Sequence, residues 1–530
     1  MSPFGASDVT KGQMMEMLYV CSSWRQAALE FIWKDLNLII RHGSSKVLIS
    51  GLPWPYLSYV PHGLACLVEN VKLTVPMSSI VNGVAHGLLS EFVRDTVEFS
   101  AARELTILVT DWSYKTLRLT DEAIGNITEF ARLIQSATQG VATVEVAFTG
   151  CSGGGNFWRG PPVGEFDEEA MGIFMNLMCA NIQFPGLEIK DMELKRPSTV
   201  DYIPQLSSLN LRCREMFDLS TSLVHKSSSS LQFLRFGLFD PRELVFDIHG
   251  NSIVYPKMKH LVILRAPLGY FEEPAKAPDT VPFPVLESLK LLIPYPFADD
   301  VLFRGNSHTL EELDIKLDAD TVNVLHDNQV FKSKDRILHT LILGGVNYNG
   351  GISLLSETVL KDFLGDLIEP VRKLVISDPL LIKPLIDAAT HGFNNVQVLN
   401  LGQEQLPFYD ILHLLKAFPV LSKLVCGVDE LGSELKHIAA DDLPDYIAST
   451  YKEAGKCMQV WKLPCVRSIN NTHITEYVIL LALCCPRLRR IDLAENVAAK
   501  YRGEIAKALE SKLYSKYTSQ LDRLVHAAFD

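Results

Sequence analysis

One pattern of apolar residues recurs along most of the chain. In it, a second apolar residue follows the first after two residues of any kind, and a third follows the second after one residue of any kind. The clearest copies start at Leu206, Leu286, Leu338 and Leu488. Looser copies start at Val68, Val141, Leu231, Met258, Leu310, Val371, Val396 and Leu421, and weaker ones at Ala102, Phe184 and Met458. Because alternate residues of a strand share a face, each copy predicts a short strand that buries its last two apolar positions.

The copies are evenly spaced in the second half of the chain. From 206 they follow at intervals of 25, 27, 28, 24 and 28 residues, and then of 33, 25, 25, 37 and 30. Prolines stand two residues before the first apolar position at Pro204, Pro256, Pro284, Pro419 and Pro486. Proline ends a helix and favours extended backbone before it. At Pro185 the same spacing points to Leu187 and conflicts with the frame starting at Phe184, so two registers remain open there.

This pattern resembles the leucine-rich repeat superfamily, in the helix-rich form typical of ribonuclease inhibitor, over about residues 60–500. The superfamily's Asn or Cys eight residues after the first Leu is present only as Asn496. The resemblance implies an α/β fold: a leucine-rich repeat solenoid with a curved parallel sheet and outer helices. The apolar spacing at 320–326 and 406–419 predicts helices, as do the long segments 211–230 and 343–370.

The two ends of the chain carry other patterns. Residues 501–525 place apolar side chains on one helical stripe, which predicts a cap for the solenoid. The alternative is a membrane-surface helix, although Lys and Arg do not dominate its polar face. The predicted organisation is therefore a helical segment at 1–40, the solenoid at 41–500 and a capping helix at 501–530.

Residues 20–38 resemble the second half of an F-box. The residues that match are Cys21, Trp24, Arg25, Ala28, Trp33, Leu36 and Leu38. The resemblance implies a short helical F-box remnant that binds a Skp-type adaptor of a cullin ubiquitin ligase through Met17, Leu18, Cys21, Trp24, Arg25 and Trp33. The first half of the module has no counterpart, because only twenty residues precede Cys21. The expectation is a truncated start or a decayed module. The alternative is that 14–35 is an amphipathic helix capping the first repeats, with both tryptophans in the core.

Composition narrows the class of protein. Hydrophobic residues make up 47% of the 530 and charged residues only 21%. The net charge of −12 argues against a nucleic-acid partner, which requires a basic face. Ten scattered cysteines do not form a dense disulfide framework, and the N-terminus lacks a signal-peptide pattern. The longest apolar run near a plausible span covers residues 477–485 and is too short to cross a membrane. We expect a cytoplasmic or nuclear protein with no membrane contact.

Catalytic and metal motifs are missing from the sequence. The glycine-rich stretch at 150–160 lacks the Gly-Lys-Ser/Thr ending of a phosphate loop, which favours an inter-repeat loop. The late cysteines Cys457, Cys465, Cys484 and Cys485 contain no C-x-x-C pair, and no histidines form an H-E-x-x-H arrangement. We expect neither enzyme activity nor a cofactor or metal.

The solenoid hypothesis assigns the concave face to partner binding, because residues between the inward positions point there. The candidates are Ser208, Asn210, Ser288, Lys290, Glu312, Asp314, Thr340, Ile342, Asn400, Arg490 and Asp492. Their mixture of charge and hydroxyl suits a protein surface. The leading hypothesis is a non-catalytic substrate-recognition subunit of an SCF-type ubiquitin ligase, with a Skp-type adaptor, a cullin and an unknown protein substrate as partners. The alternative is a leucine-rich repeat scaffold with no ubiquitin link.

Overall fold

The computed structural model describes residues 33–41, 45–50, 67–95, 102–110, 120–137, 143–149, 186–190, 206–212, 224–236, 244–247, 249–264, 280–294, 302–303, 308–327, 338–345, 357–388, 393–452, 454–463, 472–492 and 528–529, with single residues 22, 23, 25, 29 and 507. Its contacts divide the chain into two compact units. Unit 1 comprises Met1–Gly269 and Pro278–Pro284, and unit 2 comprises Tyr270–Ala277 and Val285–Asp530.

The strands of unit 1 pair in chain order. They are β1 (Asp35–Ile39), β2 (Leu48–Ser50), β3 (Asn70–Pro76), β4 (Glu104–Thr110), β5 (Thr143–Thr149), β6 (Gly186–Lys190), β7 (Ser208–Arg212), β8 (Phe233–Phe236) and β9 (His260–Ile263). From β3 to β9 each strand pairs in parallel with the next. Strand β1 pairs in parallel with β3 and antiparallel with β2.

The strands of unit 2 repeat this arrangement. They are β10 (Ser288–Pro294), β11 (Glu312–Leu317), β12 (Thr340–Gly345), β13 (Lys373–Ile376), β14 (Val398–Leu406), β15 (Lys423–Val428), β16 (Val460–Lys462), β17 (Arg490–Asp492) and β18 (Ala528–Phe529). Each pairs in parallel with the next. Parallel neighbours need a crossover between them, which the residues between successive strands provide.

The register aligns the second apolar position of every repeat into one buried row. In unit 2 this row consists of Leu289, Leu313, Leu341, Leu374, Leu399, Leu424, Trp461 and Ile491. Each of these side chains has 0% of its surface exposed. Full burial of one such side chain is worth about 1.5–3 kcal/mol, so the stacked rows supply much of the stability. No repeat can bury its row alone, since its neighbours provide the cover.

A tight turn leads into several strands. The backbone N–H of Leu421 donates to the carbonyl of Phe418 at 3.0 Å, and that of Leu488 donates to Cys485 at 3.1 Å. Pro419 and Pro486 therefore occupy the second position of a four-residue turn, where the fixed φ of proline fits. Pro419 and Pro486 are thus turn residues as well as helix terminators.

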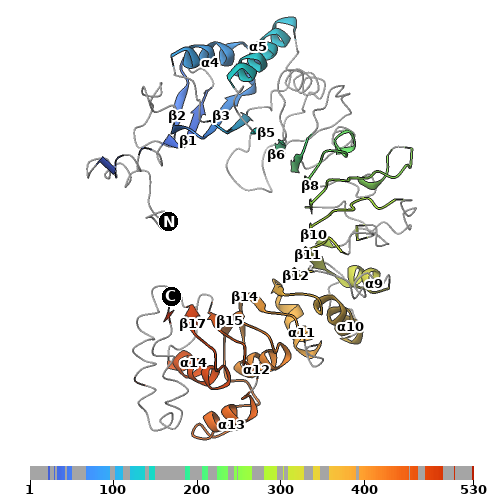
Figure 1. Cartoon of the computed structure of the whole chain (residues 1–530), viewed down its shortest axis with the longest axis vertical. Helices are drawn as coiled ribbons and strands as arrows, with labels where there is room; N and C mark the ends of the chain where they lie inside the picture. Colours follow the sequence, from blue (N-terminus) through green and yellow to red (C-terminus); the bar gives the residue numbers. More distant parts are fainter. Residues whose placement is uncertain are drawn as a thin grey trace, which may run out of the picture. The chain divides into compact units, whose positions relative to one another are not determined.

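Within each unit, the labelled helices lie on one side of the strands (Figure 1). Unit 1 contains α3 (Met77–Val81), α4 (Val84–Asp95) and α5 (Asp121–Ala137), which contact one another. Unit 2 contains α9 (Ala319–Asp327), α10 (Glu357–Ile368), the 3-10 helix η3 (Pro379–Leu381), α11 (Ile382–Ala388), α12 (Phe408–Ala417), α13 (Leu443–Thr450) and α14 (Thr472–Cys484). From α9 to α12 each α-helix contacts the next, and α13 contacts α14.

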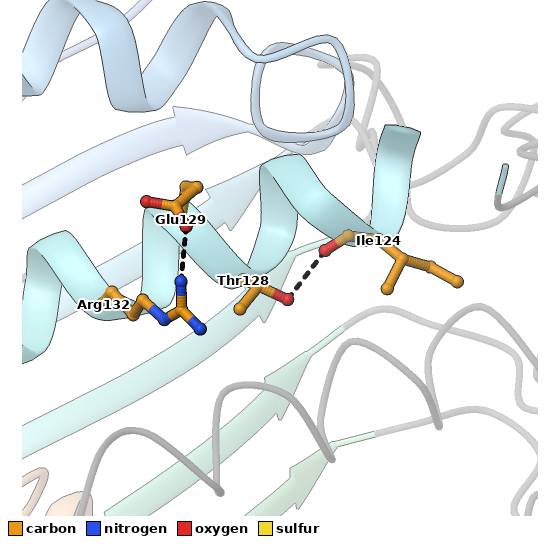
Figure 2. Close-up of polar contacts among 4 residues, drawn as sticks. All are labelled: Ile124, Thr128, Glu129 and Arg132. Carbon is orange, nitrogen blue, oxygen red and sulfur yellow. Dashed lines mark hydrogen bonds and ion pairs between the residues drawn. The ribbon is translucent and has the colours of Figure 1, made fainter. Parts of the chain in front are cut away.

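Helix α5 illustrates how the sequence determines one of these elements. Its buried side chains Ala123, Ile127, Phe130, Ala131 and Ile134 recur at helical spacing. The Thr120 hydroxyl accepts the backbone N–H of Ala123 at 3.2 Å and so caps the first turn. Figure 2 shows two further contacts along this helix. The Thr128 hydroxyl donates to the Ile124 carbonyl at 2.8 Å, and Arg132 pairs with Glu129 at 2.6 Å.

All fifteen predicted copies of the pattern coincide with a strand, β3 to β17. At the ambiguous position, Leu187 pairs with Leu209. Leu187 is therefore the second apolar position, and the frame starting at Phe184 is correct. The helices predicted at 320–326 and 406–419 correspond to α9 and α12, and α10 lies within 343–370. In 211–230 the described helical residues are 224–226. Pro204, Asn496, Cys465, 150–160 and most of 501–525 lie outside the described residues.

Candidate functional site

The candidate binding surface is the sheet face opposite the helices, which we call the open face. In unit 2 two rows of side chains cross it. Row A consists of Ser288, Glu312, Thr340, Lys373, Val398, Lys423, Val460 and Arg490. Row B, two residues further along each strand, consists of Lys290, Asp314, Ile342, Val375, Asn400, Val425, Lys462 and Asp492. Neighbouring strands are about 4.8 Å apart, so each row is a continuous line of side chains.

The structure brings most of the predicted concave residues into these rows. Lys290, Glu312, Asp314, Thr340, Ile342, Asn400 and Asp492 are half-buried, and Arg490 is exposed. Ser288 is only 5% exposed, so it reaches a partner less readily than its neighbours do. Ser208 and Asn210 are half-buried on β7 of unit 1 and belong to that unit's sheet. The predicted residues thus fall into two sets, one on each unit.

An ion pair organises the first strands of unit 2. Lys290 Nζ lies 3.0 Å from Glu312 Oε1, and the Ser288 hydroxyl donates to Glu312 Oε2 at 2.9 Å. Burial acts to raise the pKa of Glu312, but the contacts with Lys290 and Ser288 outweigh it and hold the pKa below its usual value. Glu312 is therefore a firmly ionised carboxylate with both oxygens occupied.

Asp314, two residues along the same strand, has the opposite character. Its Oδ1 is buried and has no hydrogen-bond partner among the described residues. Burial raises the pKa of Asp314, and nearby Glu312 adds to the rise, while Lys316 and Lys290 oppose it. The folded chain therefore disfavours the charge on this carboxyl group.

Two side chains on the open face make hydrogen bonds within the chain itself. Lys316 extends from β11 over Gly344 of β12 and donates to the Ser377 hydroxyl at 3.4 Å, in space that a Cβ on Gly344 would occupy. The Asn400 side-chain oxygen accepts the backbone N–H of Gly402 at 2.9 Å. Gly402 has a φ of 67°, and the register of β14 shifts there, so Asn400 stabilises a bulge. The lysine and the asparagine both shape the surface that a partner would meet.

Sequence reasoning missed the basic half of the surface. Lys373, Lys423 and Lys462 lie in rows A and B on β13, β15 and β16 but were not among the predicted residues. They occupy the same positions of the repeat as Thr340 and Asn400, so reading every copy at those positions would have found them. The rows become visible only once the strand register is known.

Comparisons with known proteins add little to this geometry. No protein-family model and no curated protein matches the chain. Among solved structures the chain is similar to LegL7, a leucine-rich repeat-containing protein of Legionella pneumophila. The identity is 12% over 94% of this chain and 99% of that chain, and the TM-score is 0.21. Because that TM-score is low, the assignment of the fold rests on the strand register and the buried rows. Each described strand from β3 to β17 coincides with a copy of the leucine-rich repeat pattern found in the sequence.

One more copy of the repeat pattern begins inside the F-box-like segment. Trp33 is 1% exposed, and Leu36 pairs with Val71 of β3. Trp33, Leu36 and Leu38 therefore occupy the three apolar positions of one more repeat, which the sequence analysis assigned to the F-box. In this conformation Trp33 packs in the core. Arg25 is exposed, and Met17, Leu18, Cys21 and Trp24 lie outside the described residues.

Other chemistry is sparse in the part of the chain that the structure describes. No three His, Cys, Asp or Glu side chains in the described ranges gather as a metal site. Cys426, Cys484 and Cys485 are buried and form no disulfide within the described residues, and burial raises the pKa of Cys426 to about 12. At that pKa the thiol is neutral and unreactive at physiological pH. Within the described part of the chain, no helix is both long and apolar enough to span a membrane.

Proposed function

We propose that this leucine-rich repeat protein is a non-catalytic binding subunit that holds a protein partner on its open face. The observation that carries the proposal is the pair of rows in unit 2, in which charged, polar and small apolar side chains alternate on rigid strands. Protein interfaces combine these side-chain types. The buried row on the other side of the sheet fixes the backbone of each strand. Binding therefore loses little conformational entropy of the backbone.

Site-directed photo-crosslinking tests this proposal. A crosslinking residue at Thr340 or Val398 samples the open face, and one at Lys361 or Lys383 samples α10 and α11 on the helix side. In cells, we expect the open-face positions to crosslink to a distinct protein. We expect the helix-side positions not to crosslink to that protein. The same products from both sides would contradict the proposal.

We further propose that the partner is a substrate presented to an SCF-type ubiquitin ligase, with residues before β1 contacting a Skp-type adaptor. The support is the F-box resemblance around Trp24 and Arg25. Burial of Trp33 restricts the adaptor surface to the residues ahead of it. The alternative is a scaffold with no ubiquitin link, which relies on the open face alone.

A pull-down separates the two candidates. The full chain is tested for capture of a purified Skp-type adaptor beside Arg25→Glu and Trp24→Ala variants. Capture by the unmodified chain, and loss of capture in variants with an unchanged circular dichroism spectrum, would support the ligase assignment. Absence of capture by a folded chain would favour the scaffold.

A further inference from the structure

Cations and valines alternate along row A in the second part of unit 2. From β13 to β17 the row reads Lys373, Val398, Lys423, Val460 and Arg490. Lys373 and Arg490 are exposed, and the other three are half-buried. A positive charge therefore recurs on every second strand, and a small apolar side chain separates each pair of charges.

The neighbouring positions strengthen this positive character. Row B adds the exposed Lys462, and its one carboxylate in this region, Asp492, pairs with Arg490. Rows A and B from β13 to β17 thus contain four cations and one acid, in a chain whose net charge is −12. A local basic strip on an acidic protein focuses a field that attracts a complementary ligand.

The lysines of the strip are available for a ligand. In the part of the chain that the structure describes, Lys373, Lys423 and Lys462 form no ion pair. Their strands are held by Leu374, Leu424 and Trp461, each 0% exposed. The backbone positions from which these lysines extend are therefore fixed before any ligand binds.

The spacing of the charges selects a ligand geometry. Strands are about 4.8 Å apart, so cations on alternate strands are about 9.6 Å apart. A polyproline II segment advances about 3.1 Å per residue with three residues per turn, which is about 9.3 Å per turn. Acidic residues at every third position of such a segment would align with Lys373 and Lys423, and the next one would compete with Asp492 for Arg490. The valines between them can accept apolar side chains.

We infer that this strip binds an extended acidic segment of a protein, with carboxylates at every third residue, laid across β13 to β17. The inference rests on the proposed function, since it identifies the partner class for the same open face. A nucleic acid fits less well, because the chain is strongly acidic and apolar side chains interrupt the cations.

Fluorescence anisotropy on the full chain tests the inference. The probes are a labelled peptide with Glu at every third position, a scrambled peptide of the same composition, and a single-stranded oligonucleotide of equal charge. The Lys373→Gln, Lys423→Gln double variant removes two cations of the strip. The matched control, Lys383→Gln with Lys452→Gln, removes two exposed cations outside the strands.

We expect the spaced peptide to bind more tightly than the other two probes. We expect the strip variant to lose about tenfold in affinity and the control less than about twofold, each with an unchanged thermal midpoint. Equal affinity in both variants, equal binding of the scrambled peptide, or preference for the oligonucleotide would overturn the inference.

The two proposals fail in distinguishable ways. If open-face crosslinks persist in the strip variant, the proposed function stands and the acidic-segment inference fails. If the spaced peptide binds as expected but cells give no open-face crosslink, the strip is confirmed and the proposed function fails.

Discussion

Two carboxyl groups that neighbour each other on the open face of β11 have pKa values shifted in opposite directions. Glu312 is paired with Lys290 and remains ionised, whereas Asp314 is partly buried and lacks a partner for Oδ1 among the described residues. An unsatisfied buried polar group reduces stability and marks a position under functional or structural constraint. Asp314 lies between Lys290 and Lys316 along the open face, so its charge state affects the surface that a partner meets.

We predict that Asp314→Asn raises the thermal midpoint of unit 2 at neutral pH. The folded-state pKa of Asp314 lies above its ordinary value because of burial. Its contribution to stability is therefore full at low pH and is lost as the pH rises through the folded-state pKa. The neutral asparagine avoids this loss, so the advantage of the variant should grow with pH.

Glu312→Gln is the matched control for this measurement. The pKa of Glu312 is lowered in the fold, so its contribution is present above the ordinary pKa and is lost as the pH falls. We expect this variant to lower the midpoint at neutral pH and to match the unmodified chain at low pH. If the thermal midpoints of the two variants changed with pH in the same way, the opposite roles assigned to Asp314 and Glu312 would be wrong.

Two glycines are predicted to respond to alanine in opposite directions. A Cβ on Gly455 would overlap Cys485 Sγ and lie 3.2 Å from the Cys484 carbonyl oxygen, whereas one on Gly365 within α10 meets nothing within 4 Å. Gly455→Ala should cost about 1–3 kcal/mol through overpacking. Gly365→Ala should stabilise by about 0.5–1 kcal/mol through helix propensity. Urea unfolding measures the change in unfolding free energy of both variants. A Gly455→Ala variant as stable as the unmodified chain would show that the backbone relaxes at this position.

At the scale of elements, the strands were largely predictable from the sequence. Every repeat buries the same face of its strand in the same register. The sequence therefore repeats two apolar residues that are two positions apart, with a third apolar residue three positions before them. The copy of the pattern at Trp33, Leu36 and Leu38, which leads into β1, was missed because these residues also match the end of an F-box. The basic strip was missed because only some copies of the pattern were read at these two positions, although the pattern also places Lys373, Lys423 and Lys462 there.

We predict that Trp33→Ala destabilises unit 1 by about 3–5 kcal/mol, as expected for a fully buried tryptophan. Hydrogen exchange should speed up in β1 and β3, which pair directly. Arg25→Ala, an exposed change in the same segment, should leave exchange unaltered. Unchanged protection in the Trp33 variant would argue that the residue belongs to a separate module.

At the scale of the molecule, charge is distributed unevenly. The chain carries −12 overall, yet cations predominate in rows A and B from β13 to β17. Composition alone would direct attention to basic partners, while the local surface favours acidic ones. At physiological ionic strength the screening length is about 8 Å, so the local strip acts on a bound segment more strongly than the overall charge does.

The division into two units was not predictable from the repeat pattern, which continues across 270–285 without a change of register in the sequence. Each unit has its own buried rows and its own open face. The proposed binding site consists of side chains of unit 2 alone, so it does not depend on how the two units are arranged.

The central claim is that the open face of unit 2 binds a protein, and photo-crosslinking along row A tests it most directly. Crosslinkers at Thr340, Val398 and Val460 sample three strands, with Lys361 and Lys383 as helix-side controls. We predict that one protein is captured from all three row A positions and from neither control. Capture from the helix side alone, or the same products at all five positions, would contradict the claim.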